Sequence, residues 1–78
     1  MNLLRKARAA RAAFGPRARE LRRAAGLSQR ELARLAIMSR KYVQQIEYGK
    51  ANPTIETIAL LAYALDCDLA DLMPTIRP

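Results

Sequence analysis

Apolar residues recur every three or four positions along most of this chain, which is the spacing of one face of an α-helix. The stretch over residues 55–65 is apolar on more than one face. No window alternates between apolar and polar residues as a strand does. The pattern therefore predicts an all-α domain, with helices over residues 16–25, 29–36, 39–48, 55–65 and 68–73.

Local signals mark the ends of these helices. Ser28 and Glu31 have the spacing of a capping box, and Ser39 and Thr54 are suitable N-caps. Gly26 and Gly49 follow the expected ends of the helices over residues 16–25 and 39–48. The positions expected to face the core are Phe14, Ala18, Leu21, Ala25, Leu32, Leu35, Ala36, Val43, Ile46, Ile55, Ile58, Leu61, Ala62 and Leu65.

Residues 2–13 are helix formers without an acid, and arginines recur there every three residues. Gly15 and Pro16 follow, and proline suits the first turn of a new helix, so we expect a separate basic arm. The arm would dock on the domain, contact phosphate or fray. A transit peptide has a similar composition, but the usual serines are missing. The expected organisation is an arm (1–13), a domain (14–73) and a tail (74–78).

The composition excludes several classes of protein. The chain has 78 residues, enough for one small domain. With one cysteine and no histidine, it has no intrachain disulfide and lacks the usual zinc ligands. No run of about 18 apolar residues is present to span a membrane. We expect a cytoplasmic protein without enzymatic activity, cofactor, metal or small-molecule ligand.

The net charge of +7 is unevenly distributed. Residues 1–30 hold nine cations and one acid, whereas residues 51–78 hold one cation and four acids. A basic half on a small domain favours a polyanionic partner. A solubilising arginine-rich surface is the alternative.

The expected helix over residues 39–48 has one strongly polar face. At about 100° per residue, Arg40, Lys41, Gln44 and Gln45 gather on one side, opposite Val43. Arginine matches the acceptors of guanine, and glutamine matches the donor–acceptor pair of adenine. Two short helices joined by a brief turn form a helix-turn-helix, which places the second helix in the major groove. By itself, the same face would be interpreted as an ordinary solvated helix surface.

The run GLSQRELARLAIMSRKYVQQIEYGKANPT resembles the lambda-repressor/Cro (XRE-like) helix-turn-helix family. The resemblance covers residues 14–73. Its motifs are the glycine-to-glutamine entry at 26–29, Leu32-Ala33, Ser39, Ile46-Glu47 with Gly49, and Asn52-Pro53-Thr54. Residues 39–43 are also similar to small controller proteins of restriction–modification systems.

The resemblance implies a five-helix domain that binds double-stranded operator DNA as a homodimer. It implies base contacts from the polar face of residues 39–48 and an ion pair between Arg22 and Glu47. The residues expected at phosphates are Ser28, Gln29, Tyr42, Lys50 and Asn52. Tyr42 is equally suited to the core or to a thymine methyl group. A dimer interface is expected at Leu60, Tyr63, Asp66 and Leu69, although Leu60 and Tyr63 would also suit additional core.

One position departs from the family pattern. Ile37 stands in the turn where the family often has glycine, and the backbone there tends to adopt a positive φ. A β-branched residue in that region is strained by about 1–2 kcal/mol.

A rival hypothesis for the whole chain is an antitoxin-like module that uses the same domain to bind a protein, with the basic arm as the partner-binding segment.

Overall fold

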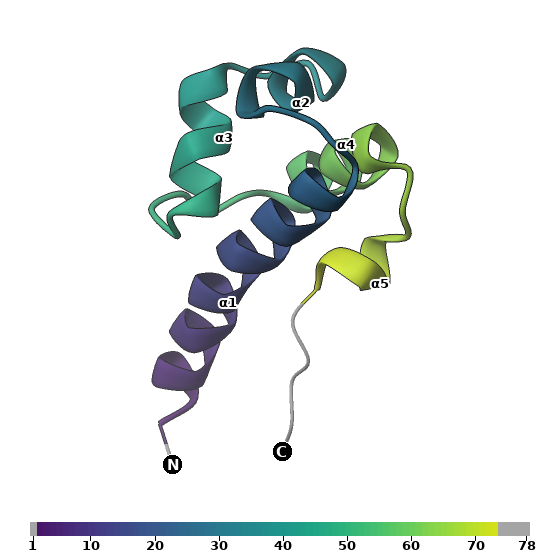
Figure 1. Ribbon diagram of the computed structural model, residues 1–78. Coiled ribbons are helices and arrows are strands. Elements are labelled where there is room, and N and C mark those ends of the chain that lie inside the picture. Colours follow the sequence, from purple (N-terminus) through teal and green to yellow (C-terminus); the bar gives the residue numbers. More distant parts are fainter. Residues whose placement is uncertain (1, 74–78) are drawn as a thin grey trace.

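The computed structural model describes residues 2–73. This part of the chain contains helices joined by turns and loops, and no strand (Figure 1). Its five helices confirm the all-α prediction. They are α1 (Leu3–Ala24), α2 (Gln29–Leu35), α3 (Arg40–Glu47), α4 (Ile55–Leu65) and α5 (Leu69–Leu72). None of the described helices is long and apolar enough to cross a membrane.

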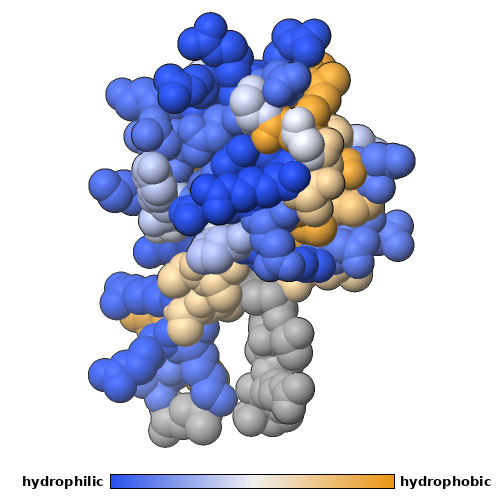
Figure 2. Space-filling view, in the orientation of Figure 1, coloured by the Kyte–Doolittle hydropathy of each residue, from blue (hydrophilic) through white to orange (hydrophobic). Residues whose placement is uncertain are grey.

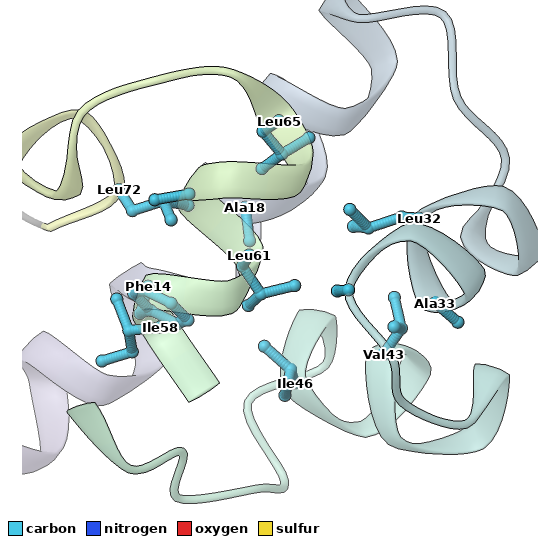
Figure 3. Packing of buried hydrophobic residues seen from close by; sticks show 12 residues of the cluster. Phe14, Ala18, Leu32, Ala33, Val43, Ile46, Ile58, Leu61, Leu65 and Leu72 are labelled. Carbon is cyan, nitrogen blue, oxygen red and sulfur yellow. The ribbon is translucent and has the colours of Figure 1, made fainter. Parts of the chain in front are cut away.

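The helices pack around the carboxyl-terminal half of α1, while its amino-terminal half extends away from them (Figure 1). Helices α2 and α3 form the helix-turn-helix on one side, and α4 and α5 cover another. The core brings Leu32, Val43 and Leu61 together from three different helices (Figure 3). Leu72 of α5 closes it and is fully buried.

The expected helix break at Gly15 and Pro16 is wrong, because α1 runs through both residues. Gly15 serves a close approach between helices: a Cβ there would lie 2.6 Å from the carbonyl oxygen of Ile46. Glycine also lacks the Cβ with which a following proline ring clashes in a helix. Pro16 cannot donate to the carbonyl of Ala12, but both residues are exposed, so water can satisfy that oxygen.

Two apolar positions expected in the core are largely exposed. Leu35, at the end of α2, is 49% exposed, and Ile55, in the first turn of α4, is 64% exposed. Ala25, the C-cap of α1, is exposed as well. All three lie at helix ends, where the periodic pattern continues past the surface that the neighbouring helices cover.

The caps form as the sequence indicates. Ser28 Oγ accepts from the backbone N–H of Glu31 at 3.0 Å, and Glu31 Oε1 accepts from the backbone N–H of Ser28 at 2.9 Å. These bonds from Ser28 hold the pKa of Glu31 below its ordinary value. The side chains of Ser39 and Thr54 cap α3 and α4 by accepting from the backbone N–H groups of Tyr42 and Thr57. The turn between α2 and α3 carries Ile37 at φ 58°, so the position that favours glycine has a left-handed backbone.

Candidate nucleic-acid interface

Helix α3 has a buried side and an open polar side. Val43 and Ile46 are buried in the core. Arg40 and Lys41 are exposed, and Gln44 and Gln45 are half-buried. Figure 2 shows a mainly hydrophilic surface on the α3 side of the molecule. The four side chains expected to contact bases therefore share one accessible face, in a helix that its other face fixes to the core.

Arg22 of α1 and Glu47 of α3 form a buried ion pair. Arg22 Nε donates to Glu47 Oε2 at 2.7 Å, and Nη2 donates to Oε1 at 3.0 Å. Arg22 Nη1 also donates to the carbonyl of Leu27 at 2.9 Å. The hydrogen bonds to Glu47 raise the pKa of Arg22 above its ordinary value and outweigh the opposing effect of burial. This bidentate contact orients the end of α3 relative to α1.

Two further side chains reach Glu47, and sequence reasoning missed both contacts. Gln29 Nε2 donates to Glu47 Oε1 at 3.1 Å. Arg19 donates to the backbone carbonyl of Glu47 at 3.3 Å and lies 5.6 Å from the centre of the Tyr48 ring, within cation–π range. Gln29, expected at a phosphate, is thus also held by an internal acceptor. Glu47 connects α1, the start of α2 and the end of α3.

A polar hollow opens where the end of α1 meets the starts of α2 and α3. It contains the expected phosphate contacts Ser28 and Gln29 together with the base-contact candidate Arg40. It is also lined by Arg22, Arg23 and Arg30. Arg23 and Arg30 were not expected at a phosphate, although both lie close to the Ser28 cap in the chain. The hollow can accept an anionic group, because Arg23, Arg30 and Arg40 present exposed guanidinium groups there.

The other expected phosphate contacts lie at the opposite end of α3 or within it. Lys50 and Asn52 are exposed in the loop after α3, and the backbone N–H of Lys50 donates to the carbonyl of Gln45 at 2.8 Å. Asn52 borders a hollow whose remaining lining comes from the amino-terminal half of α1. Tyr42 is half-buried and packs against the core.

The residues expected at a dimer interface lie on α4 and just after it, away from α3. Tyr63 is 82% exposed, and Leu60 and Leu69 are exposed to a lesser degree. Asp66 adopts a left-handed backbone at the end of α4. Beside it, burial and the neighbouring aspartates raise the pKa of Cys67, so its thiol stays protonated. No group of metal-binding side chains occurs among the described residues.

The sequence of this domain matches the family model for Helix-turn-helix over residues 19–72. The chain belongs to the lambda-repressor/Cro (XRE-like) helix-turn-helix family. Membership makes this XRE-like protein a DNA-binding transcription regulator, as the sequence predicted. No match was found among curated proteins.

Two solved structures resemble this XRE-like protein closely. One is the restriction–modification controller protein C.AhdI from Aeromonas hydrophila, with 45% identity and a TM-score of 0.78, over 80% of this chain and 94% of that one. The other is the clp gene regulator ClgR from Corynebacterium glutamicum, with 32% identity and a TM-score of 0.76, over 80% of each chain. Both are regulators with the same helical fold.

Proposed function

We propose that this protein is a sequence-specific transcription regulator that binds a pseudo-palindromic operator as a homodimer, with α3 in the major groove. It acts by occupying or abutting a promoter and carries out no enzymatic reaction. Its similarity over 94% of a restriction–modification controller protein supports a controller-type role.

The observation that carries this proposal is the polar face of α3 on a fixed support. Glu47 ties the end of α3 to Arg22 and Gln29, so the helix does not need to be ordered when DNA binds. A side chain that is already positioned loses less entropy on binding. Arg40 is the candidate for a guanine contact, and Gln44 and Gln45 are candidates for adenine. Lys41 suits either a base or a phosphate.

Phosphate contacts at both ends of α3 would set the orientation of the helix in the groove. The hollow with Ser28 and Gln29 supplies one side, and Lys50 with Asn52 supplies the other. Arg23 and Arg30 add to the first group. Backbone contacts of this kind fix register without reading sequence.

The homodimer is proposed from the exposed apolar groups on and after α4. Tyr63, Leu60 and Leu69 leave apolar surface that a second copy would cover. Two-fold pairing through this surface would place the two α3 helices one DNA turn apart, about 34 Å.

Selection of sites from a random duplex pool tests the proposal. We expect an enriched inverted repeat with half-site centres about 10 base pairs apart. Binding that is steeply salt-dependent but blind to sequence would contradict base recognition by α3. Absence of DNA binding would contradict the proposal as a whole and favour the antitoxin-like hypothesis.

Paired variants make the test specific to α3. Gln44→Ala should reduce discrimination at one position of each half-site and leave the salt dependence unchanged. Arg30→Gln should weaken binding to all sequences equally and reduce the slope of log K against log salt by about 0.9 per protomer, or about 1.8 for the dimer. The opposite assignment of the two effects would contradict the proposed orientation of the domain.

A further inference from the structure

The amino-terminal half of α1 is a long, rigid and cationic extension. From Leu3 to Gly15 it spans about 18 Å, at about 1.5 Å per residue. The match to the family model begins at residue 19, so this extension lies outside the part of the chain that the family model covers. Residues 3–15 hold four cations and no acid, so the extension has no acid of its own to neutralise it.

Arg8 and Arg11, two of the four basic residues of this extension, are aligned on α1 with the residues that contact α3. Counted at about 100° per residue, Arg8, Arg11, Gly15, Arg19 and Arg22 fall within an arc of about 80° on α1. The carboxyl-terminal part of this arc contacts the end of α3, because Gly15 packs against the carbonyls of Ile46 and Glu47 and Arg22 pairs with Glu47. The amino-terminal part of the arc, with Arg8 and Arg11, must therefore face the same side as α3, beyond its last turn.

The contacts of the loop after α3 agree with this geometry. Gly49 lies next to α1, since a Cβ there would be 3.8 Å from the Cα of Ala12. Asn52 shares a hollow with Leu4, Ala7, Arg8 and Arg11. Figure 2 shows hydrophilic side chains projecting from the lower half of α1 on the same side as α3.

Arg8 and Arg11 are also available for an external partner. Both are exposed. The ion pairs of α1 among the described residues involve Arg17, Arg19 and Arg22. Being three residues apart on a helix, Arg8 and Arg11 have Cβ atoms about 5–6 Å apart, so the two guanidinium groups can act on one continuous anionic chain.

We propose that Arg8 and Arg11, together with Asn52, form a second phosphate-binding site for the DNA backbone, at the opposite end of α3 from the hollow around Ser28. The inference rests on the proposed binding of DNA by α3. With α3 in the major groove, a DNA strand that passes its last turn meets Lys50 and Asn52 and continues along the basic face of α1. The extension is as long as about five base pairs at 3.4 Å each, so it enlarges the protected region of the backbone.

The test compares single-charge variants of the full chain. Arg8→Gln and Arg11→Gln each remove one guanidinium from the proposed site. Lys6→Gln removes one charge from a half-buried position of the same helix, about 200° around from Arg8, and serves as the control for net charge. Affinity is measured for the selected duplex and for a scrambled duplex over a series of salt concentrations.

We expect Arg8→Gln and Arg11→Gln each to lower the slope of log K against log salt by about 0.9 per protomer, or about 1.8 for the dimer, and Lys6→Gln to leave it unchanged. The advantage of the wild-type dimer over each arginine variant should then shrink about 12-fold between 50 and 200 mM salt. The loss should be equal on the two duplexes, because phosphate contacts carry no sequence information. Ethylation interference should identify phosphates whose ethylation weakens binding of the wild type. Ethylation of the phosphates that Arg8 contacts should no longer weaken binding of Arg8→Gln.

Equal slopes for Arg8→Gln and Lys6→Gln would overturn the inference, because they would show only a general effect of net charge. An unchanged slope with weaker self-association of Arg8→Gln, measured by sedimentation without DNA, would assign the arginines to a second copy of the chain instead. If the wild type selects an operator and the slopes do not change, the second phosphate site alone fails. If it binds no duplex, the proposed function fails as well.

Discussion

Gly15 of α1 lies against the carbonyl of Glu47, so closely that a Cβ at position 15 would come within 2.5 Å of that oxygen. The obstacle is backbone, which cannot rotate away as a side chain can. The approach brings α3 directly onto α1 and places Glu47 within reach of Arg22. A glycine inside a helix, which costs about 0.5–1 kcal/mol relative to alanine, is thus required for the position of α3.

Replacement of Gly15 by alanine should lower the free energy of unfolding by about 1–3 kcal/mol, because overpacking outweighs the gain in helix propensity. Urea unfolding measures the change. Ala13→Ser, which adds an atom to an exposed position of the same helix, is the control and should have a small effect. A more stable Gly15→Ala variant would contradict the close approach.

Replacement of Glu47 by alanine should be the most damaging single change in the ion-pair network. It leaves the guanidinium of Arg22 buried without its partner, which costs about 3–5 kcal/mol. Glu20→Gln, which removes the exposed pair with Arg17, should change stability by no more than about 1 kcal/mol. Urea unfolding measures the free energy of unfolding of both variants. Similar decreases for the two would show that burial of the ion pair does not determine its contribution to stability. A double variant with Arg22→Met should recover part of the loss.

Ile37→Gly should raise the melting temperature. Ile37 has φ 58° and is 83% exposed, so glycine removes backbone strain of about 1–2 kcal/mol and sacrifices little burial. Asp66 has a similar φ of 54°, but aspartate tolerates this region better, so Asp66→Gly should gain less. Thermal unfolding of both variants provides the measurement. A lower melting temperature for Ile37→Gly would refute the strained turn.

The capping box of α2 should make stability depend on pH in the acid range. The pKa of Glu31 is lower in the folded protein than in the unfolded chain, so its contribution is complete above the unfolded pKa. The contribution is lost as the pH falls through the folded pKa. Thermal unfolding from pH 7 to pH 2 should therefore show a difference between wild type and Glu31→Gln that shrinks towards low pH. A constant difference would exclude ionisation of Glu31 as its source.

Self-association should depend on Tyr63. Tyr63→Ala removes the most exposed ring of the proposed dimer interface and should shift the monomer–dimer equilibrium towards monomer in sedimentation equilibrium. Ile55→Ala removes a similarly exposed apolar group from the first turn of the same helix and should leave the equilibrium unchanged. Equal effects of the two variants would argue against a specific interface at Tyr63.

The sequence predicted the features that depend on local chemistry. The Ser28 and Thr54 caps and the polar face of α3 follow from residues close together in the chain. The positive φ at Ile37 was expected from the family pattern, because an isoleucine by itself disfavours it. The pairing of Arg22 with Glu47 is not local, and it was accessible only through the family resemblance. The contacts of Arg19 and Gln29 with Glu47 were missed, because neither residue carries a local signal of its partner.

The errors have a common physical origin. Local rules predict a helix break at Gly15 and Pro16, whereas glycine is needed at position 15 because of the carbonyls of Ile46 and Glu47, 31 and 32 residues further along the chain. Periodicity also assigned Leu35 and Ile55 to the core, but it does not tell where the covering helices end. Tertiary packing decides both points. The direction of the basic segment could not be predicted either, since it depends on α1 being continuous.

The continuity of α1 also determines how this protein can change length. Because one helix joins the basic segment to the residues that hold α3, a single inserted or deleted residue between Arg11 and Gly15 would rotate Arg8 by about 100° away from the side of α3. An insertion of four residues would restore the direction to within about 40°. The chain can therefore accept or lose whole turns at this point far more readily than single residues.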